Sequence, residues 1–130
     1  MEVEAGMGEK QWPKELRLVD AGKVLKVTFE NGRAFDLSAE YLRVMSPSAE
    51  VKGHTEAERK TVGGKRAVAV TEIVPVGSYA VRLTFDDLHS TGIYTWDYLY
   101  ELGESYAEKW AGYLRELEAK RLSRDRPGEK

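Results

Sequence analysis

Residues 15–38 alternate apolar and polar side chains, and this alternation constrains the fold more than any other feature of the chain. A period of two places every second side chain on the same face of a strand. The stretch is interrupted at residues 20–22 and at Asn31-Gly32, a dipeptide preferred in turns with positive φ. It therefore predicts three antiparallel strands, whose apolar side chains are Leu16, Leu18, Val24, Val27, Phe29 and Phe35.

Residues 66–85 also have strand character, interrupted at Pro75 and Gly77, and predict two more strands. Between the two strand regions, Ser38 is placed to N-cap a short helix that ends before Pro47, because the residue before proline avoids the helical region.

Two further helices are predicted near the C-terminus. Thr95 caps a short helix, and Gly103 is expected to end it in the left-handed conformation. Residues 104–122 then repeat apolar side chains at helical spacing. This stripe is predicted to cover the sheet, with partner binding as the alternative.

The predicted fold class is α+β: a mainly antiparallel sheet of about five to six strands, with two short helices and one longer C-terminal helix packed on it. A chain of 130 residues fits one domain. We predict a disordered segment over 1–12, the domain over 13–122 and a disordered tail over 123–130. The mixed-charge stretch over 52–66 is expected to be a solvated loop.

Composition excludes several classes of function. The chain has no cysteine, which removes disulfides, thiolate nucleophiles, iron–sulfur ligation and thiolate zinc sites. A net charge of -2 argues against nucleic-acid binding, and no apolar run approaches the roughly 20 residues of a membrane helix. The first residues lack the pattern of a secretory signal, so a cytoplasmic location is expected.

The candidate sites centre on His89, one of two histidines. A hydrolase would pair it with a serine, but no G-x-S-x-G motif is present. A metal site matches no demanding spacing, and we predict no catalytic residue, no metal ligand and no cofactor. His89 remains open to two interpretations: a backbone-bonded imidazole that fixes the turn before Trp96, or a functional group. The partners weighed for it are Ser46, Ser48 and Ser90 for hydrolysis, and Glu50, His54, Asp86 and Asp87 for a metal.

Two other short patterns have ordinary explanations. Val62–Lys65 resembles part of a phosphate loop, but the full motif is absent and loop flexibility explains its glycines. Asp86 and Asp87 are adjacent, and adjacent residues on a strand point to opposite faces, so they are not expected to share a substrate. Both are interpreted as solvated turn acids.

Two segments, "LRVMSPSAEVKGH" and "IVPVGSYAVRLTFDDLHSTGIYTWDYLYELG", together with the following helix, closely resemble the gamma-butyrobetaine hydroxylase-like N-terminal domain family over about Pro13 to Leu122. The resemblance implies a small bacterial domain, mostly of unknown function. In the family it also precedes the catalytic domain of carnitine-synthesis dioxygenases and accompanies some iron–sulfur carrier ATPases. The oxygenase iron site belongs to that catalytic domain, so the resemblance implies no hydroxylation here.

The resemblance also implies a site to compare. In the hydroxylases, three cysteines of the matching region and a histidine hold a structural zinc ion. Here the cysteine positions carry Ser46, Ser48 and Val51, while the histidine position carries His89. Hydroxyls and a valine do not replace thiolates around zinc. The resemblance therefore implies a lost zinc site, with His89 bonding to one of the two serines instead. Many short members have glycine where this chain has Leu88, a departure that affects the turn before His89.

The leading hypothesis is a non-enzymatic cytoplasmic binding or adaptor module for an unidentified protein or small ligand, without nucleic acid or membrane. The alternatives are a metal-binding accessory protein linked to iron or iron–sulfur metabolism, and a small Ser/His hydrolase. The predicted binding surface consists of Arg43, Ser46, Ser48, His89, Tyr94 and Trp96.

Overall fold

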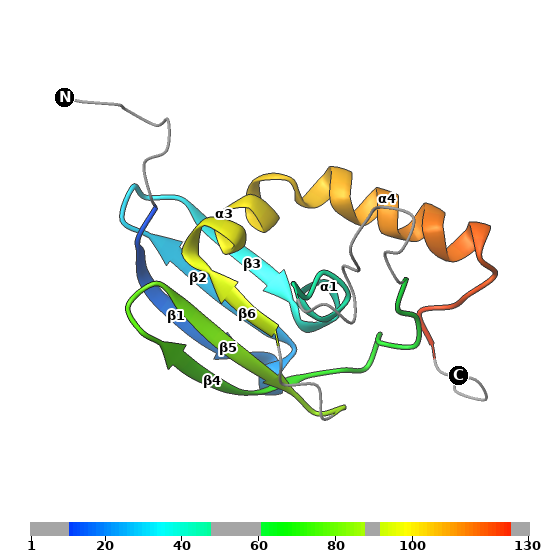
Figure 1. The fold of residues 1–130 in the computed structure, drawn as a ribbon, viewed down its shortest axis with the longest axis horizontal. Coiled ribbons are helices and arrows are strands. Elements are labelled where there is room, and N and C mark those ends of the chain that lie inside the picture. Colours follow the sequence, from blue (N-terminus) through cyan, green and yellow to red (C-terminus); the bar gives the residue numbers. More distant parts are fainter. Residues whose placement is uncertain (1–10, 48–60, 88–91, 126–130) are drawn as a thin grey trace.

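A computed structural model of the chain describes residues 11–47, 61–87 and 92–125. Within these ranges, six strands form two antiparallel sheets, and three α-helices and one short 3₁₀ turn accompany them (Figure 1). The predicted α+β class is confirmed. The strands do not form the one sheet that the sequence predicted, because they divide into two sheets of three.

The first sheet has the order β1-β2-β3 and confirms the three strands predicted from the alternation. Its strands are β1 (Pro13–Val19), β2 (Val24–Phe29) and β3 (Ala34–Ser38). In β2 the alternation buries Leu25, Val27 and Phe29 completely. Val24, one of the apolar side chains noted in the sequence, lies on the other face of the strand and is only partly buried. The β2–β3 turn has Gly32 at φ 93°, as the Asn-Gly pair predicted.

The second sheet has the order β4-β5-β6, with strands β4 (Val70–Val76), β5 (Ala80–Phe85) and β6 (Gly92–Thr95). Pro75 does not interrupt β4, because β4 is an edge strand, where proline is tolerated. The chain turns instead at Gly77, whose φ is 56°. The sequence predicted about five to six strands but placed only five of them, and β6 is the sixth.

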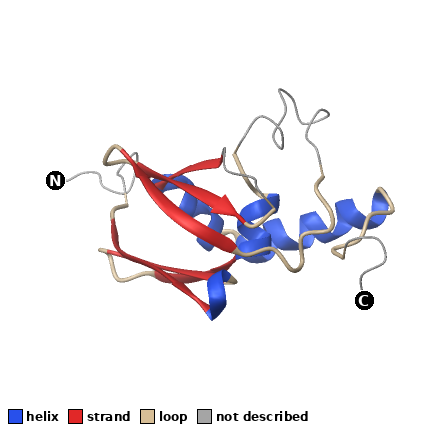
Figure 2. Ribbon diagram, turned by 90° about the horizontal axis from the view of Figure 1, so that it is seen from below, coloured by secondary structure: helices blue, strands red, loops and turns tan. Residues whose placement is uncertain are grey.

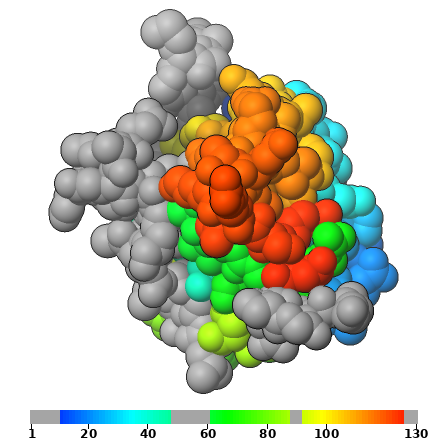
Figure 3. Space-filling view, turned by 90° about the vertical axis from the view of Figure 1, so that its right-hand side faces the viewer, coloured from blue at the N-terminus to red at the C-terminus, as the bar shows by residue number. Residues whose placement is uncertain are grey.

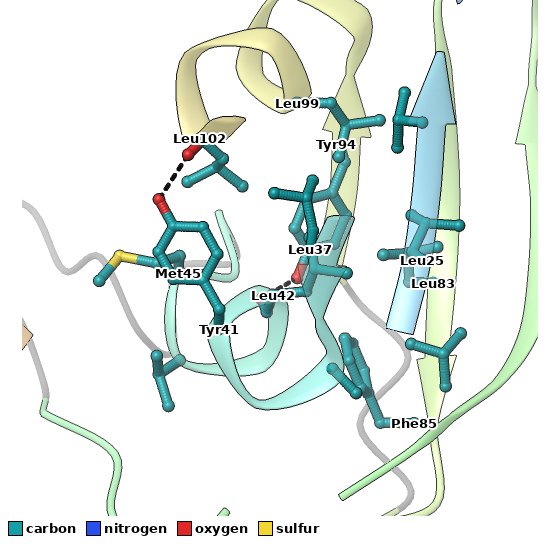
Figure 4. Close-up of a cluster of buried hydrophobic side chains, with 14 of the residues drawn as sticks. Leu25, Leu37, Tyr41, Leu42, Met45, Leu83, Phe85, Tyr94, Leu99 and Leu102 are labelled. Atoms are coloured by element: carbon teal, nitrogen blue, oxygen red, sulfur yellow. Dashed lines mark hydrogen bonds between the residues drawn. The ribbon is translucent and has the colours of Figure 1, made fainter. Parts of the chain in front are cut away.

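The two sheets form two layers, which Figure 2 shows from below. Their buried side chains, Leu25 from β2 and Leu83 from β5 among them, belong to one hydrophobic cluster that also takes in helix residues (Figure 4). At the 3₁₀ turn η1 (Asp20–Gly22), a Cβ on Gly22 would lie 2.3 Å from the carbonyl oxygen of Val70. Glycine at this position thus lets the first sheet approach the start of the second.

The predicted N-caps of two helices are confirmed. Helix α1 (Ala39–Val44) begins where the Ser38 hydroxyl accepts a hydrogen bond from the Tyr41 amide, and α3 (Trp96–Glu104) begins where Thr95 does the same for Tyr98. Gly103 does not end α3 as predicted, since the helix continues through it. A Cβ there would lie 2.3 Å from the Phe35 ring, so glycine allows α3 to lie close to β3.

Helix α4 (Tyr106–Ala119) carries the predicted apolar stripe. The sequence predicted that this stripe covers the sheet, but most of it packs on other parts of the chain. The Trp110 ring lies 6.1 Å from the Tyr41 ring of α1, and the Tyr113 hydroxyl donates to the carbonyl of Val62 at 2.7 Å. Most of the stripe therefore covers α1 and residues 61–66. No helix in the described ranges is long and apolar enough to cross a membrane.

The C-terminal segment, defined here as residues 122–125, lies against residues 61–66 (Figure 3). The amides of Gly64 and Arg66 donate to the carbonyls of Ser123 and Arg124 at 2.8 and 2.9 Å. The described part of the charged stretch is thus held by main-chain hydrogen bonds and is not a freely solvated loop.

Candidate functional site

Three of the six predicted binding residues, Arg43, Ser46 and Tyr94, come together where the end of α1 meets the start of β6. Two others, Ser48 and His89, lie outside the described residues. We call this region the α1–β6 junction and define it by five residues: Arg43, Ser46, Lys65, Asp87 and Tyr94.

Ser46 and Tyr94 are the uncharged residues of the junction, and both are buried. Ser46 is fully buried and closely packed. A Cβ on Gly92 would lie 2.6 Å from the Ser46 hydroxyl, so only glycine leaves room for this contact. The Tyr94 hydroxyl donates to the carbonyl of Leu42 at 2.5 Å (Figure 4). It also shares a hydrogen bond with Ser46.

The phenol of Tyr94 stays protonated. Burial raises its pKa far above the ordinary value, and the hydrogen bond with Ser46 and the charge of Arg43 oppose this shift only in part. Tyr94 therefore serves as a neutral hydrogen-bond donor that ties β6 to α1.

The charged half of the junction contains one carboxylate and two cations. The Arg43 Nε donates to the Asp87 Oδ2 at 2.8 Å, and the Lys65 Nζ donates to the same oxygen at 2.5 Å. Arg43 is 7% exposed, whereas the side chains of Lys65 and Asp87 are about one-fifth exposed. These three side chains carry a formal net charge of about +1 at neutral pH, by their ordinary ionisation.

The Arg43 guanidinium is not fully satisfied. Its Nη1 atom is buried and has no hydrogen-bond partner within the part of the chain that the structure describes. A buried donor without a partner costs about 1–3 kcal/mol, so such groups are rare in folded proteins and call for an explanation.

Asp86 and Asp87 have different hydrogen-bond partners. The Asp86 Oδ1 accepts from the amide of Ala69 at 3.1 Å and so extends the pairing of β4 with β5. Asp87 is paired with two cations and is not the solvated turn acid that the sequence predicted. Arg43 and Lys65 lie 44 and 22 positions away from it, and no local spacing indicates these pairs.

Trp96 is not part of the junction. Its indole Nε1 donates to the carbonyl of Ser78 at 2.9 Å, and its amide donates to the carbonyl of Tyr79 at 3.2 Å. Both contacts are with the β4–β5 turn, at the end of β6 opposite to Gly92. Trp96 therefore fixes that turn and the start of α3.

The structure also accounts for residues that were considered for a phosphate loop and for a hydrolase site. The amide of Gly64 donates to the C-terminal segment, and Lys65 donates to Asp87. Ser46 is fully buried and so is closed to a substrate. Ser90 lies outside the described residues.

A metal ion does not fit the described residues of the junction. In the described ranges, no three His, Cys, Asp or Glu side chains form a group that could hold one. The Ser46 hydroxyl bonds to Tyr94, and Asp87 is neutralised by two cations. Of the residues weighed as ligands from the sequence, Glu50, His54 and His89 lie outside the described residues.

The fold and the junction define a small α+β domain in which ion pairs and hydrogen bonds join a short helix to the second of two sheets. A family model described as "Gamma-butyrobetaine hydroxylase-like, N-terminal" matches residues 16–100. The chain belongs to this family, which confirms the resemblance seen in the sequence.

Solved structures agree with this assignment. Two solution NMR structures are 42% and 39% identical, with TM-scores of 0.78 for both, and cover 94% and 98% of this chain and 95% and 98% of their own. A crystal structure of a protein of unknown function of the DUF971 family, from Acidithiobacillus ferrooxidans ATCC 23270, is 42% identical. It covers 70% of this chain and 91% of its own, with a TM-score of 0.59. No curated protein matches the chain.

Proposed function

We propose that this protein is a non-enzymatic cytoplasmic binding module, an adaptor whose binding site is the α1–β6 junction and in which the zinc site implied by the resemblance is lost. The observation that carries the proposal is the Arg43 guanidinium, which is buried at the end of α1 and whose Nη1 has no hydrogen-bond partner among the described residues. Core packing alone does not require such a group, because apolar residues of similar volume often replace buried ion pairs without loss of stability.

The chemistry of the junction favours binding over catalysis. Ser46 and Tyr94 are buried and engaged with each other, and Asp87 is held by two cations. None of these groups is poised to exchange a proton with a substrate. What the junction does offer is an excess of positive charge beside a partly exposed lysine.

The predicted binding surface changes in one respect. Arg43, Ser46 and Tyr94 are all less than a tenth exposed, so a partner would first meet Lys65 and Asp87, the partly exposed members of the junction. Neither Lys65 nor Asp87 belongs to the binding surface that was predicted from the sequence. The partner is an unidentified protein or small ligand, and this proposal assigns no role to nucleic acid or membrane.

The proposal is tested by affinity capture from native lysate with the wild-type chain and Lys65→Glu. The matched control is Lys26→Glu, because Lys26 is also paired with an aspartate, Asp36, at 3.0 Å. We expect a companion that the wild type and the control retain and that Lys65→Glu loses. Equal retention by all three chains, with native-like circular dichroism, would refute the junction as the binding site.

A further inference from the structure

We infer that the α1–β6 junction binds a carboxylate group, which accepts a hydrogen bond from the unpartnered Nη1 of Arg43 beside Lys65. This inference rests on the proposed function and names the chemistry of its ligand. It is carried by the buried, unpartnered nitrogen, by the pairing of Arg43 with Asp87 and by the net charge of the three side chains.

The geometry of Arg43 leaves one edge of its guanidinium for a ligand. Asp87 engages Nε at 2.8 Å, which fixes the orientation of the planar group. Nη1 belongs to the other edge of the same plane, and a guanidinium presents its donors in a fork that suits carboxylate oxygens. Asp87 therefore acts as a positioning residue that holds the guanidinium in place and leaves Nη1 for a ligand.

Lys65 forms the approach to this edge. Its side chain is 21% exposed and its Nζ lies 2.5 Å from the Asp87 Oδ2, the same oxygen that accepts the hydrogen bond from Arg43. Nη1 itself is shielded from solvent. Because Nη1 is buried, neighbouring side chains have to move when the anion enters, and Lys65, which shares the Asp87 carboxylate with Arg43, adds positive charge nearby.

The charge of the junction selects the kind of anion. Arg43, Lys65 and Asp87 together carry about +1 at neutral pH, which one carboxylate neutralises. A phosphate dianion would leave a negative charge uncompensated in a largely buried site, at a cost in desolvation. A carboxylate is thus favoured over phosphate, whether it belongs to a free small molecule or to an acidic side chain of a protein.

The test is an NMR titration of the full chain at about pH 8 and constant ionic strength, where inorganic phosphate is mostly the dianion. The probes are sodium acetate, inorganic phosphate and the blocked tripeptide acetyl-Ala-Glu-Ala-amide. We expect saturable shifts at the junction with a carboxylate probe and binding of phosphate at least about tenfold weaker. Tighter binding of acetate would indicate a small-molecule source, and tighter binding of the peptide a protein source.

The variants separate the roles of the three side chains. Arg43→Lys keeps the charge but removes the guanidinium fork, and it should weaken carboxylate binding at least about tenfold. Asp87→Asn removes a negative charge while keeping an acceptor for Nε, and should tighten binding about threefold or more. Lys65→Met should weaken binding, and Lys26→Met, outside the junction, should leave it unchanged.

Shifts that rise linearly without saturation in the wild type would overturn the inference, as would equal binding by Arg43→Lys or weaker binding by Asp87→Asn. If Arg43→Lys fails to fold, the other two variants still test the inference. Carboxylate binding should become tighter in Asp87→Asn and weaker in Lys65→Met. A companion lost with Lys65→Glu but no carboxylate binding would leave the proposed function standing and reject the ligand class. Carboxylate binding with an unchanged set of captured proteins would reject a protein companion at the junction and leave a small ligand as its partner.

Discussion

Among single residues, Gly103 and Gly112 both lie inside helices, but a methyl group would meet different surroundings at each. A Cβ at Gly103 would lie 2.3–2.5 Å from three atoms of the Phe35 ring. A Cβ at Gly112 would find only the Arg115 guanidinium, at 3.7 Å. Packing against β3 therefore explains one glycine, whereas no comparable contact constrains the other.

Alanine at these two positions should change stability in opposite directions. Gly112→Ala should raise the free energy of unfolding by up to about 1 kcal/mol, the difference in helix propensity. Gly103→Ala gains the same propensity but must displace the Phe35 ring, and overpacking of this kind costs about 1–3 kcal/mol. Urea unfolding of both variants measures the difference. An equal gain in both would contradict the close contact of α3 with β3.

The buried tyrosines should make stability fall at high pH. Burial is the main cause that raises the pKa of Tyr113, to about 12 from an ordinary value of 10.0. The unfolded chain then releases this proton at lower pH than the folded chain. The stability that Tyr113 contributes is therefore complete below about pH 10 and is lost as the pH rises toward 12.

Tyr113→Phe tests this linkage. Between pH 10 and 12, the fall in unfolding free energy should become shallower than in the wild type by up to about 1.4 kcal/mol per pH unit. The lost hydrogen bond to Val62 lowers stability at every pH and does not affect this slope. Chemical denaturation at a series of pH values gives the slopes, and parallel curves for the two chains would show that the tyrosine is not protected from ionisation.

At the scale of elements, the C-terminal segment makes contacts with α4, α1 and residues 61–66 and so holds them together. The Arg124 guanidinium makes two hydrogen bonds to Glu40, at 2.8 and 2.7 Å, and lies 5.3 Å from the centre of the Trp110 ring. Glu40 is only 5% exposed, and its hydrogen bond is the main cause that raises the pKa of Arg124. The segment also holds residues 61–66, which carry Lys65 to the junction.

Removal of Arg124 should destabilise the protein more than removal of an exposed arginine. Arg124→Met leaves the buried Glu40 carboxylate without these two donors, and we expect a loss of about 2 kcal/mol. Arg121→Met, at an exposed position, is the control and should change stability by less than about 0.5 kcal/mol.

A double-mutant cycle with Glu40→Gln measures the coupling directly. The double variant should be more stable than the two single losses predict, because neither partner is then left as an unpaired charge. Strictly additive losses in thermal or urea unfolding would mean that the two side chains do not depend on each other.

At the scale of the whole molecule, the features that sequence reasoning predicted were local. The Asn31-Gly32 turn and the caps at Ser38 and Thr95 depend on neighbours within a few residues, and each was found where expected. The division into two sheets was missed, because strand pairing between distant segments leaves no trace in local periodicity. The same reason explains Gly103, whose role depends on Phe35 in another element.

The candidate site was predictable only in part. The motifs grouped Arg43, Ser46 and Tyr94, which the structure places close together, but the burial of Arg43 was not predicted because an arginine near a helix end is usually exposed. Lys65 and Asp87 were missed, since ion pairs across 44 and 22 positions cannot be found from spacing. Ser48 and His89 lie outside the described residues, and their roles remain predictions.

The central claim is that this junction is a binding site assembled by the chain's own hydrogen bonds and ion pairs, without a metal ion. Elemental analysis of the purified wild-type chain, combined with thermal unfolding before and after treatment with a chelator, tests it most directly. The account predicts far less than about one metal ion per chain and an unchanged midpoint, since a structural metal would contribute to folding stability. Stoichiometric zinc or iron that is lost in His89→Ala, with a lower midpoint after chelation, would contradict it and favour the metal-binding accessory function.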